Sequence, residues 1–140
     1  MDVEGVVDAL NGALRLQYRS ALAYTVTAGS FVGLRFVPLA EQLAAFGRSE
    51  LDDARRLVEK IVTLGGTPVT EPAEVRCHPD GADALRWLLE IEEQAVEALQ
   101  DCIPYTGQEG RSEALEHRLE HMIMRKQEQV DYLLRAQRRP

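Results

Sequence analysis

The sequence predicts an all-α fold in which four helices form two hairpins joined by a long crossover. In four stretches, apolar residues recur at alternating spacings of three and four, which is the pattern of one buried helix face. Residues 67–80 carry three prolines and exceed the connection that adjacent antiparallel helices need, so they can cross the length of a bundle. No strand pattern competes, and the 140 residues fit a single domain, 1–140.

The first hairpin is expected from residues 3–31 and 38–64. Asp2 is a candidate N-cap of its first helix, and Pro38 suits the first turn of its second helix. Gly65-Gly66 then stops the second helix. The apolar faces are Val3, Val7, Leu10, Leu14, Ala21, Tyr24 and Ala28 in the first helix and Leu39, Leu43, Phe46, Leu57, Ile61 and Leu64 in the second.

The second hairpin is expected from residues 80–104 and 112–138. Asp80 is a candidate N-cap of its first helix. Trp87 falls off the apolar face of that helix, and we expect it either to cover the crossover or to lie in a subunit interface. The apolar faces are Leu85, Leu88 or Leu89, Val96, Leu99 and Ile103 in the first helix and Leu115, Leu119, Met122 and Leu133 in the second.

A belt of polar residues interrupts the four apolar faces near their middles. This polar belt consists of Gln17, Glu50, Asp53, Glu92, Lys126 and Gln129. Tyr24 falls on the same face as Gln17, so its hydroxyl could hydrogen-bond into the belt. Glu93 is the alternative to Glu92 as the core glutamate of its helix. Four helices that bury polar groups at one level indicate a site inside the bundle.

Three segments resemble bacterioferritins. They are LNGALRL at 10–16, similar to the opening helix of that family, residues 54–68, similar to the end of its second helix, and EQVDYL at 128–133, similar to its Glu-His-Ile-Asp-Trp-Leu segment. The similarity extends from residue 10 to residue 134 and implies a ferritin-like four-helix bundle. The di-iron members of that class carry one Glu on each of two helices and a Glu-x-x-His pair on each of the other two.

The resemblance implies a degenerate form of the di-iron ferroxidase site. Glu50 and Glu92 match the ligands of the family. The replacements are Gln17 for Glu, Asp53 for His, Lys126 for Glu and Gln129 for His. The oxygen ligands of Glu50, Asp53 and Glu92 could hold a single iron or another divalent metal.

Lys126 argues against two metal ions. An ammonium has no lone pair to donate to a metal, and it repels cations. Two unit charges about 4 Å apart interact by roughly 4 kcal/mol at an effective dielectric near 20, and a divalent ion doubles that energy. The same ammonium could instead replace the metal by pairing with the belt carboxylates.

Two further family features are missing. Leu51 stands where the resemblance implies a haem-ligating Met, so no haem is expected. The chain ends at Pro140, which leaves little room for the fifth helix that helps to close a 24-subunit shell. We therefore expect a homo-oligomer, either a dimer or a larger assembly without that shell.

Composition limits the partners. The formal net charge of −7 argues against binding to nucleic acid or to an anionic membrane surface. No apolar run approaches the roughly 20 residues that span a bilayer. Cys77 and Cys102 form neither a disulfide framework nor a zinc motif, so we expect a cytoplasmic protein.

One helix face outside the belt carries candidate metal ligands. These are Glu116, His117, Glu120 and His121, with the histidines at i and i+4. They could form a surface metal site or simply a solvated helix face.

Three functions remain open. The first is a ferritin-like protein without ferroxidase activity that binds or transforms a small molecule in the bundle core, with Glu50, Glu92 and Lys126 as acid–base residues. The second is an iron-binding oxidoreductase with an altered ligand set. The third is a non-catalytic structural or assembly protein whose polar belt is a salt bridge in place of the metals.

Overall fold

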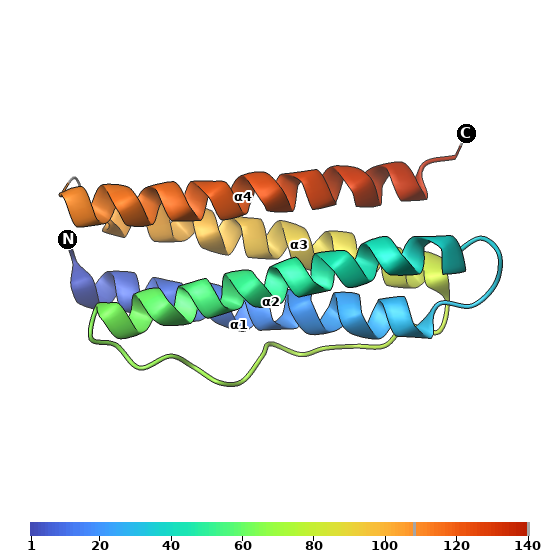
Figure 1. Ribbon diagram of the computed structural model, residues 1–140, viewed down its shortest axis with the longest axis horizontal. Coiled ribbons are helices and arrows are strands. Elements are labelled where there is room, and N and C mark those ends of the chain that lie inside the picture. Colours follow the sequence, from blue (N-terminus) through green and yellow to red (C-terminus); the bar gives the residue numbers. More distant parts are fainter. Residues whose placement is uncertain (108, 140) are drawn as a thin grey trace.

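The computed structural model describes residues 1–107 and 109–139 and confirms the predicted all-α fold (Figure 1). Its described residues form four long helices and two short 3₁₀ helices. The long helices are α1 (Val3–Ser30), α2 (Ala40–Thr63), α3 (Gly81–Cys102) and α4 (Gly110–Gln137). The 3₁₀ helices are η1 (Val37–Leu39), just before α2, and η2 (Ile103–Tyr105), just after α3.

The helix ends follow local rules. The carboxylate of Asp2 accepts a 3.0 Å hydrogen bond from the backbone N–H of Gly5, and Asp80 accepts one of 2.8 Å from Ala82. Gly65 has a φ of +87°, the left-handed conformation that glycine adopts beyond a helix end. Pro38 lies in η1, so α2 begins two residues later than expected.

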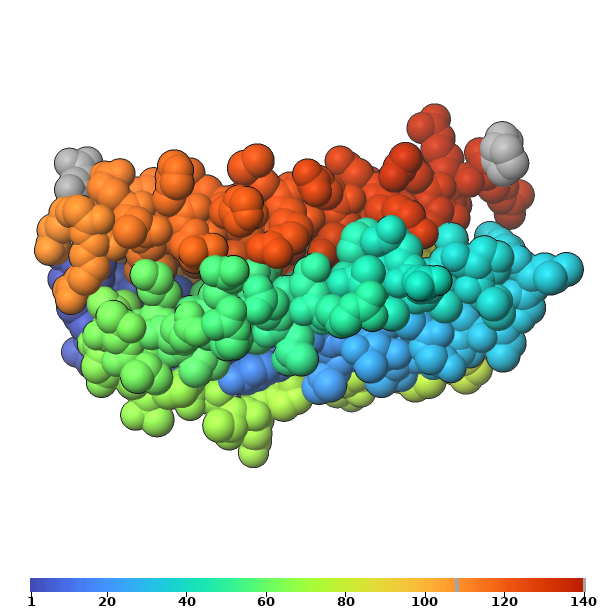
Figure 2. All heavy atoms as spheres, viewed as in Figure 1, coloured from blue at the N-terminus to red at the C-terminus, as the bar shows by residue number. Residues whose placement is uncertain are grey.

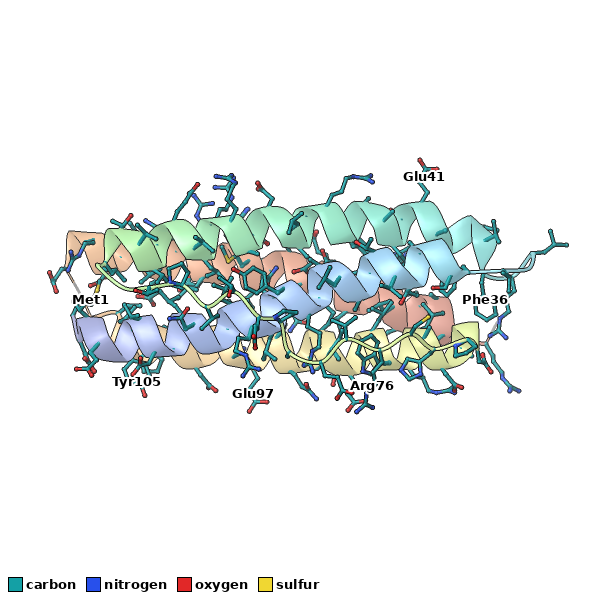
Figure 3. The ribbon with its side chains drawn as sticks, turned by 90° about the horizontal axis from the view of Figure 1, so that it is seen from below. Met1, Phe36, Glu41, Arg76, Glu97 and Tyr105 are labelled. Carbon is teal, nitrogen blue, oxygen red and sulfur yellow. The ribbon has the colours of Figure 1, made fainter. Side chains whose placement is uncertain are left out.

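The helices run in an up-down-down-up order (Figure 1). α1 and α4 point one way, and α2 and α3 point the other way. The crossover, residues 64–80, runs back along the bundle and lies over α1 (Figure 3). It is held there by the hydroxyl of Tyr18, which donates to the carbonyl of Val69 at 3.0 Å, and by the side chain of Asn11, which accepts from the Val69 N–H at 2.9 Å.

Two apolar clusters fill the bundle, one toward each end. The first contains Val6, Leu10, Ala13, Leu14, Ala54, Leu57, Ile61, Leu99, Cys102, Leu115, Leu119 and Met122. The second contains Ala23, Tyr24, Leu43, Leu85, Trp87, Leu88, Ile91 and Leu133. The polar belt separates these two clusters. On the face shown in Figure 2, atoms of α2 and α4 lie side by side along most of the bundle. The belt side chains themselves are buried.

Trp87 packs into the second cluster, although it lies off the predicted face. It is 9% exposed, and its ring lies 5.3 Å from the ring of His78 in the crossover. Trp87 therefore contacts the crossover, which agrees with the first of the two expectations. Across residues 1–107 and 109–139, no helix has both the length and the apolar character that crossing a bilayer requires.

Candidate functional site

The polar belt brings one or two buried side chains from each long helix to a common level. Gln17 comes from α1, Glu50 from α2 and Glu92 from α3. Lys126 and Gln129 lie on α4, and their i, i+3 spacing places both on its inner face. All five side chains are at most 2% exposed, so their polar groups depend on one another for partners.

Lys126 is the centre of the network. Its Nζ donates to Glu50 Oε2 at 2.7 Å and to Glu92 Oε1 at 2.9 Å. Gln129 Nε2 donates to Glu50 Oε1 and, at 2.7 Å, to Glu92 Oε2. Each carboxylate oxygen of the two glutamates therefore accepts a hydrogen bond from a nitrogen of α4. Gln17 adds a bond to Glu50 Oε2 and one of 2.9 Å to the Glu50 carbonyl.

The mutual contacts decide the charges. Burial lowers the pKa of Lys126, but the two glutamates outweigh burial and raise it above its ordinary value, so Lys126 remains an ammonium. Burial raises the pKa of Glu92, but Lys126 and the hydrogen bonds outweigh burial and lower it. Burial, with help from the charge of Glu92, raises the pKa of Glu50 to about 7 in spite of Lys126. The polar belt therefore contains a permanent Lys126–Glu92 ion pair, and Glu50 titrates near neutral pH.

We expect Glu50 to make folding stability fall as pH rises toward neutrality. Its pKa in the folded protein lies above the ordinary 4.5, so between these values the folded state holds a proton that the unfolded chain has released. The stability from this proton is complete below about pH 4.5 and is lost as pH rises through about 7, a change of about 3 kcal/mol. Urea denaturation at a series of pH values measures it.

The Glu50→Gln variant should flatten this pH dependence. The exposed Glu93→Gln is the matched control and should retain the wild-type slope. Glu92 and Lys126 do not change the stability between about pH 4.5 and 7. The pKa of Glu92 is lowered, so its contribution is lost only in stronger acid. The pKa of Lys126 is raised, so its contribution is lost only in stronger base. Equal slopes in the wild type and in Glu50→Gln would contradict the raised pKa.

Asp53 lies outside the network. Its carboxylate pairs with the guanidinium of Arg125 at 2.7 Å. Burial raises the pKa of Asp53, and Arg125 and Lys126 oppose that rise. Within the described part of the chain, no group of three or more His, Cys, Asp or Glu side chains is arranged to hold a metal ion. The expected ligand set of Glu50, Asp53 and Glu92 is therefore not assembled.

The sequence left one position of the belt unresolved and gave no notice of two residues beside it. Glu92 is fully buried and Glu93 is exposed, which decides between these neighbours. Ser20 is also buried, and its spacing of three from Gln17 could have placed it on the core face. Arg125 was missed because a residue next to Lys126 on a helix points away from the inner face.

Tyr24, whose hydroxyl could have hydrogen-bonded into the belt, instead lies in the apolar cluster beside it. Its hydroxyl is buried and has no partner among the described residues, and the same holds for the Ser20 hydroxyl. Burial raises the pKa of Tyr24 well above its ordinary value, and the carboxylates of Glu92 and Glu50 raise it further. Tyr24 therefore remains a neutral phenol that packs edge-on against Phe46, with 5.6 Å between the ring centres.

Four helices in this order, with a crossover and a buried polar level, define a ferritin-like four-helix bundle. The sequence model of the ferritin family described as "Ferritin-like domain" matches residues 7–138, and the chain belongs to this family. None of the curated proteins matches.

Two solved structures show how closely the bundle is shared. The crystal structure of ferritin-like, diiron-carboxylate proteins from Bacillus anthracis strain Ames has a TM-score of 0.91 and 26% identity, with 99% of each chain covered. A Rhodobacter capsulatus bacterioferritin, whose structure has a metal-free dinuclear site and a haem iron, has a TM-score of 0.82 and 21% identity. That comparison covers 91% of this chain and 80% of the bacterioferritin chain, and it shows the fold alone.

Proposed function

We propose that this protein is a non-catalytic member of the ferritin family in which an internal lysine replaces the dinuclear metal centre. The observation that carries this proposal is the position of Lys126 Nζ, 2.7 Å from Glu50 and 2.9 Å from Glu92 in the sealed core. The ion pair links α4 to both α2 and α3, so its role is to fix how these helices pack. The protein then has a structural or assembly role, in which its single domain contacts other chains through its surface.

The side chains at this level do not fit a dinuclear metal centre. The carboxylate oxygens of Glu50 and Glu92 already accept hydrogen bonds from Lys126 and Gln129, whose N–H groups offer no lone pair to a metal. A divalent ion in contact range of the ammonium would meet a repulsion of roughly 8 kcal/mol, which is twice the value for two unit charges. Ferroxidase activity with an altered ligand set is therefore the weaker candidate.

Chemistry on a small molecule in the core is also disfavoured. The three candidate acid–base residues, Glu50, Glu92 and Lys126, are at most 1% exposed. Each of them is hydrogen-bonded to the others or to a glutamine. A ligand would have to break these bonds and leave buried charges without partners, which is strongly unfavourable.

The surface of the α1–α2 pair supports the homo-oligomeric part of the proposal. Leu22, Leu51 and Val62 are each about half exposed or more, at 45%, 61% and 57%. Leu51 lies at a hollow of about 450 Å³ that is also lined by Tyr18, Ala54 and Val58 and by the charged residues Arg48, Asp52 and Arg55. A second copy of the chain would remove this apolar surface from water. We propose that the assembly resides in the cytoplasm, where the two free cysteines remain reduced.

Ferrous iron tests the proposal directly. We expect no iron bound in the core on anaerobic titration, and no oxidation above the rate in buffer when oxygen is then admitted. An active ferroxidase is the positive control under the same conditions. Two irons bound per chain, followed by oxygen consumption, would overturn the proposal in favour of a ferroxidase with altered ligands.

A further inference from the structure

The outer face of α4 presents two histidines one helical turn apart. His117 and His121 are exposed and lie at i and i+4 of a continuous helix, so their side chains project on the same side. Neither imidazole forms a hydrogen bond or an ion pair with any residue in 1–107 or 109–139. Both ring nitrogens of each are therefore open to an external ligand.

The two imidazoles line one hollow of the surface. This hollow has a volume of about 370 Å³ and is bounded by Ala114, His117, Arg118 and His121. Ala114 stands one turn before His117, and its short side chain leaves space above the helix. Both residues line this hollow, and their i, i+4 spacing places them on the same side of the helix.

Carboxylates flank the two histidines on α4. Glu116 and Glu120 are next to His117 and His121 in the sequence, and Glu113 lies one turn before His117. They place negative charge near the two histidines, which a divalent cation would neutralise. Arg118 is the opposing cation at the hollow.

We propose that His117 and His121 form a binding site for one borderline divalent transition-metal ion, of the class of Cu²⁺, Ni²⁺ and Zn²⁺. Imidazole nitrogen suits these ions, and affinity for a given nitrogen site is highest for Cu²⁺. Two ring nitrogens on adjacent turns chelate the ion, and water completes its coordination. Because no third His, Cys, Asp or Glu among the described residues joins them, the ion keeps open positions.

This site is independent of the polar belt. His117 and His121 are exposed on the outside of α4, whereas Lys126 and Gln129 of the same helix face the core. The function proposed above can therefore fail without affecting this site, and the site can fail without affecting that function. The experiment must therefore distinguish metal bound at this site from any metal bound in the core.

Calorimetric titration of the full chain with Cu²⁺, and then with Zn²⁺, tests the site. We expect one ion per chain. His117→Gln and His121→Gln should each lower the affinity by at least roughly tenfold, because changing a residue that only supports a metal ligand already costs about that much, and these variants remove the ligand itself. His78→Gln changes the third histidine of the chain and is the matched control, with unchanged binding expected.

Moving the second histidine along the helix gives a sharper test. In the His121→Gln background, Glu113→His restores an i, i+4 pair with His117, and we expect it to recover binding. Glu116→His in the same background is the same substitution at the position next to His117, which faces another side of the helix. We expect Cu²⁺ binding to this variant to remain weak. Equal affinities in these two variants, or in the wild type and His121→Gln, would overturn the chelate, as would the absence of Cu²⁺ binding to a folded wild-type chain.

Discussion

Replacing Lys126 by Met will lower the free energy of unfolding by about 3–5 kcal/mol, the usual cost of removing one partner from a buried ion pair. Met fills a similar volume, so the loss comes from charge. Without the ammonium, Glu50 and Glu92 face each other in the core, with only Gln129 donating to both. Urea denaturation at a pH above the wild-type pKa of Glu50, which is about 7, compares the variant with a wild type in which Lys126 faces two ionised carboxylates.

The chain offers an internal control for this measurement. Lys60 is the only other lysine, lies partly exposed on α2 and forms no ion pair within the part of the chain that the structure describes. Lys60→Met should change stability by no more than about 0.5 kcal/mol, as surface substitutions usually do. If the two lysine variants lose equally little, the buried ion pair is not what holds α4 against α2 and α3.

A second variant separates charge from packing. Adding Glu50→Gln and Glu92→Gln to Lys126→Met removes the uncompensated carboxylates, and we expect part of the lost stability to return. If the loss arose only from packing of the lysine stem, the two added substitutions would deepen it. The sign of the change therefore identifies its cause.

The periodicity of the sequence was enough to predict the fold and most of the buried level. Helical spacing decides which residues share a face, and polar residues on an otherwise apolar face have to meet one another inside a bundle. Gln17, Glu50, Glu92, Lys126 and Gln129 do so, as their positions in the four stripes indicate.

The partner of Asp53 could not be predicted in the same way. Asp53 also lies on its stripe, but it finds Arg125 at the edge of the seam between α2 and α4, at 2.7 Å. The arginine is 31% exposed and belongs to no stripe, so periodicity gives no signal for it. The choice between a lysine that holds the site closed and one that leaves room for a metal likewise depends on distances of 2.7 and 2.9 Å that only the packed helices define.

Restoring the family's residue types at the level should convert it into a metal site. The four substitutions are Gln17→Glu, Asp53→His, Lys126→Glu and Gln129→His, and we expect the resulting chain to bind two ferrous ions where the wild type binds none in its core. Four glutamates and two histidines then replace the present network, which provides the ligand set of the di-iron class. Without metal, the carboxylates repel one another, so iron should raise the melting temperature of this variant and not that of the wild type.

The control that isolates Lys126 keeps it and makes the other three substitutions. We expect that chain to bind no pair of irons, because the ammonium still occupies the centre and repels a cation there.

Both chains should carry His117→Gln and His121→Gln, so that metal on the outer face of α4 does not contribute. Arg125 loses its partner in both, but it is 31% exposed and can turn to water. If the three-substitution chain binds two irons as well as the four-substitution chain does, Lys126 is not what excludes the metals; if a folded four-substitution chain binds none, these positions do not correspond to the family's ligands.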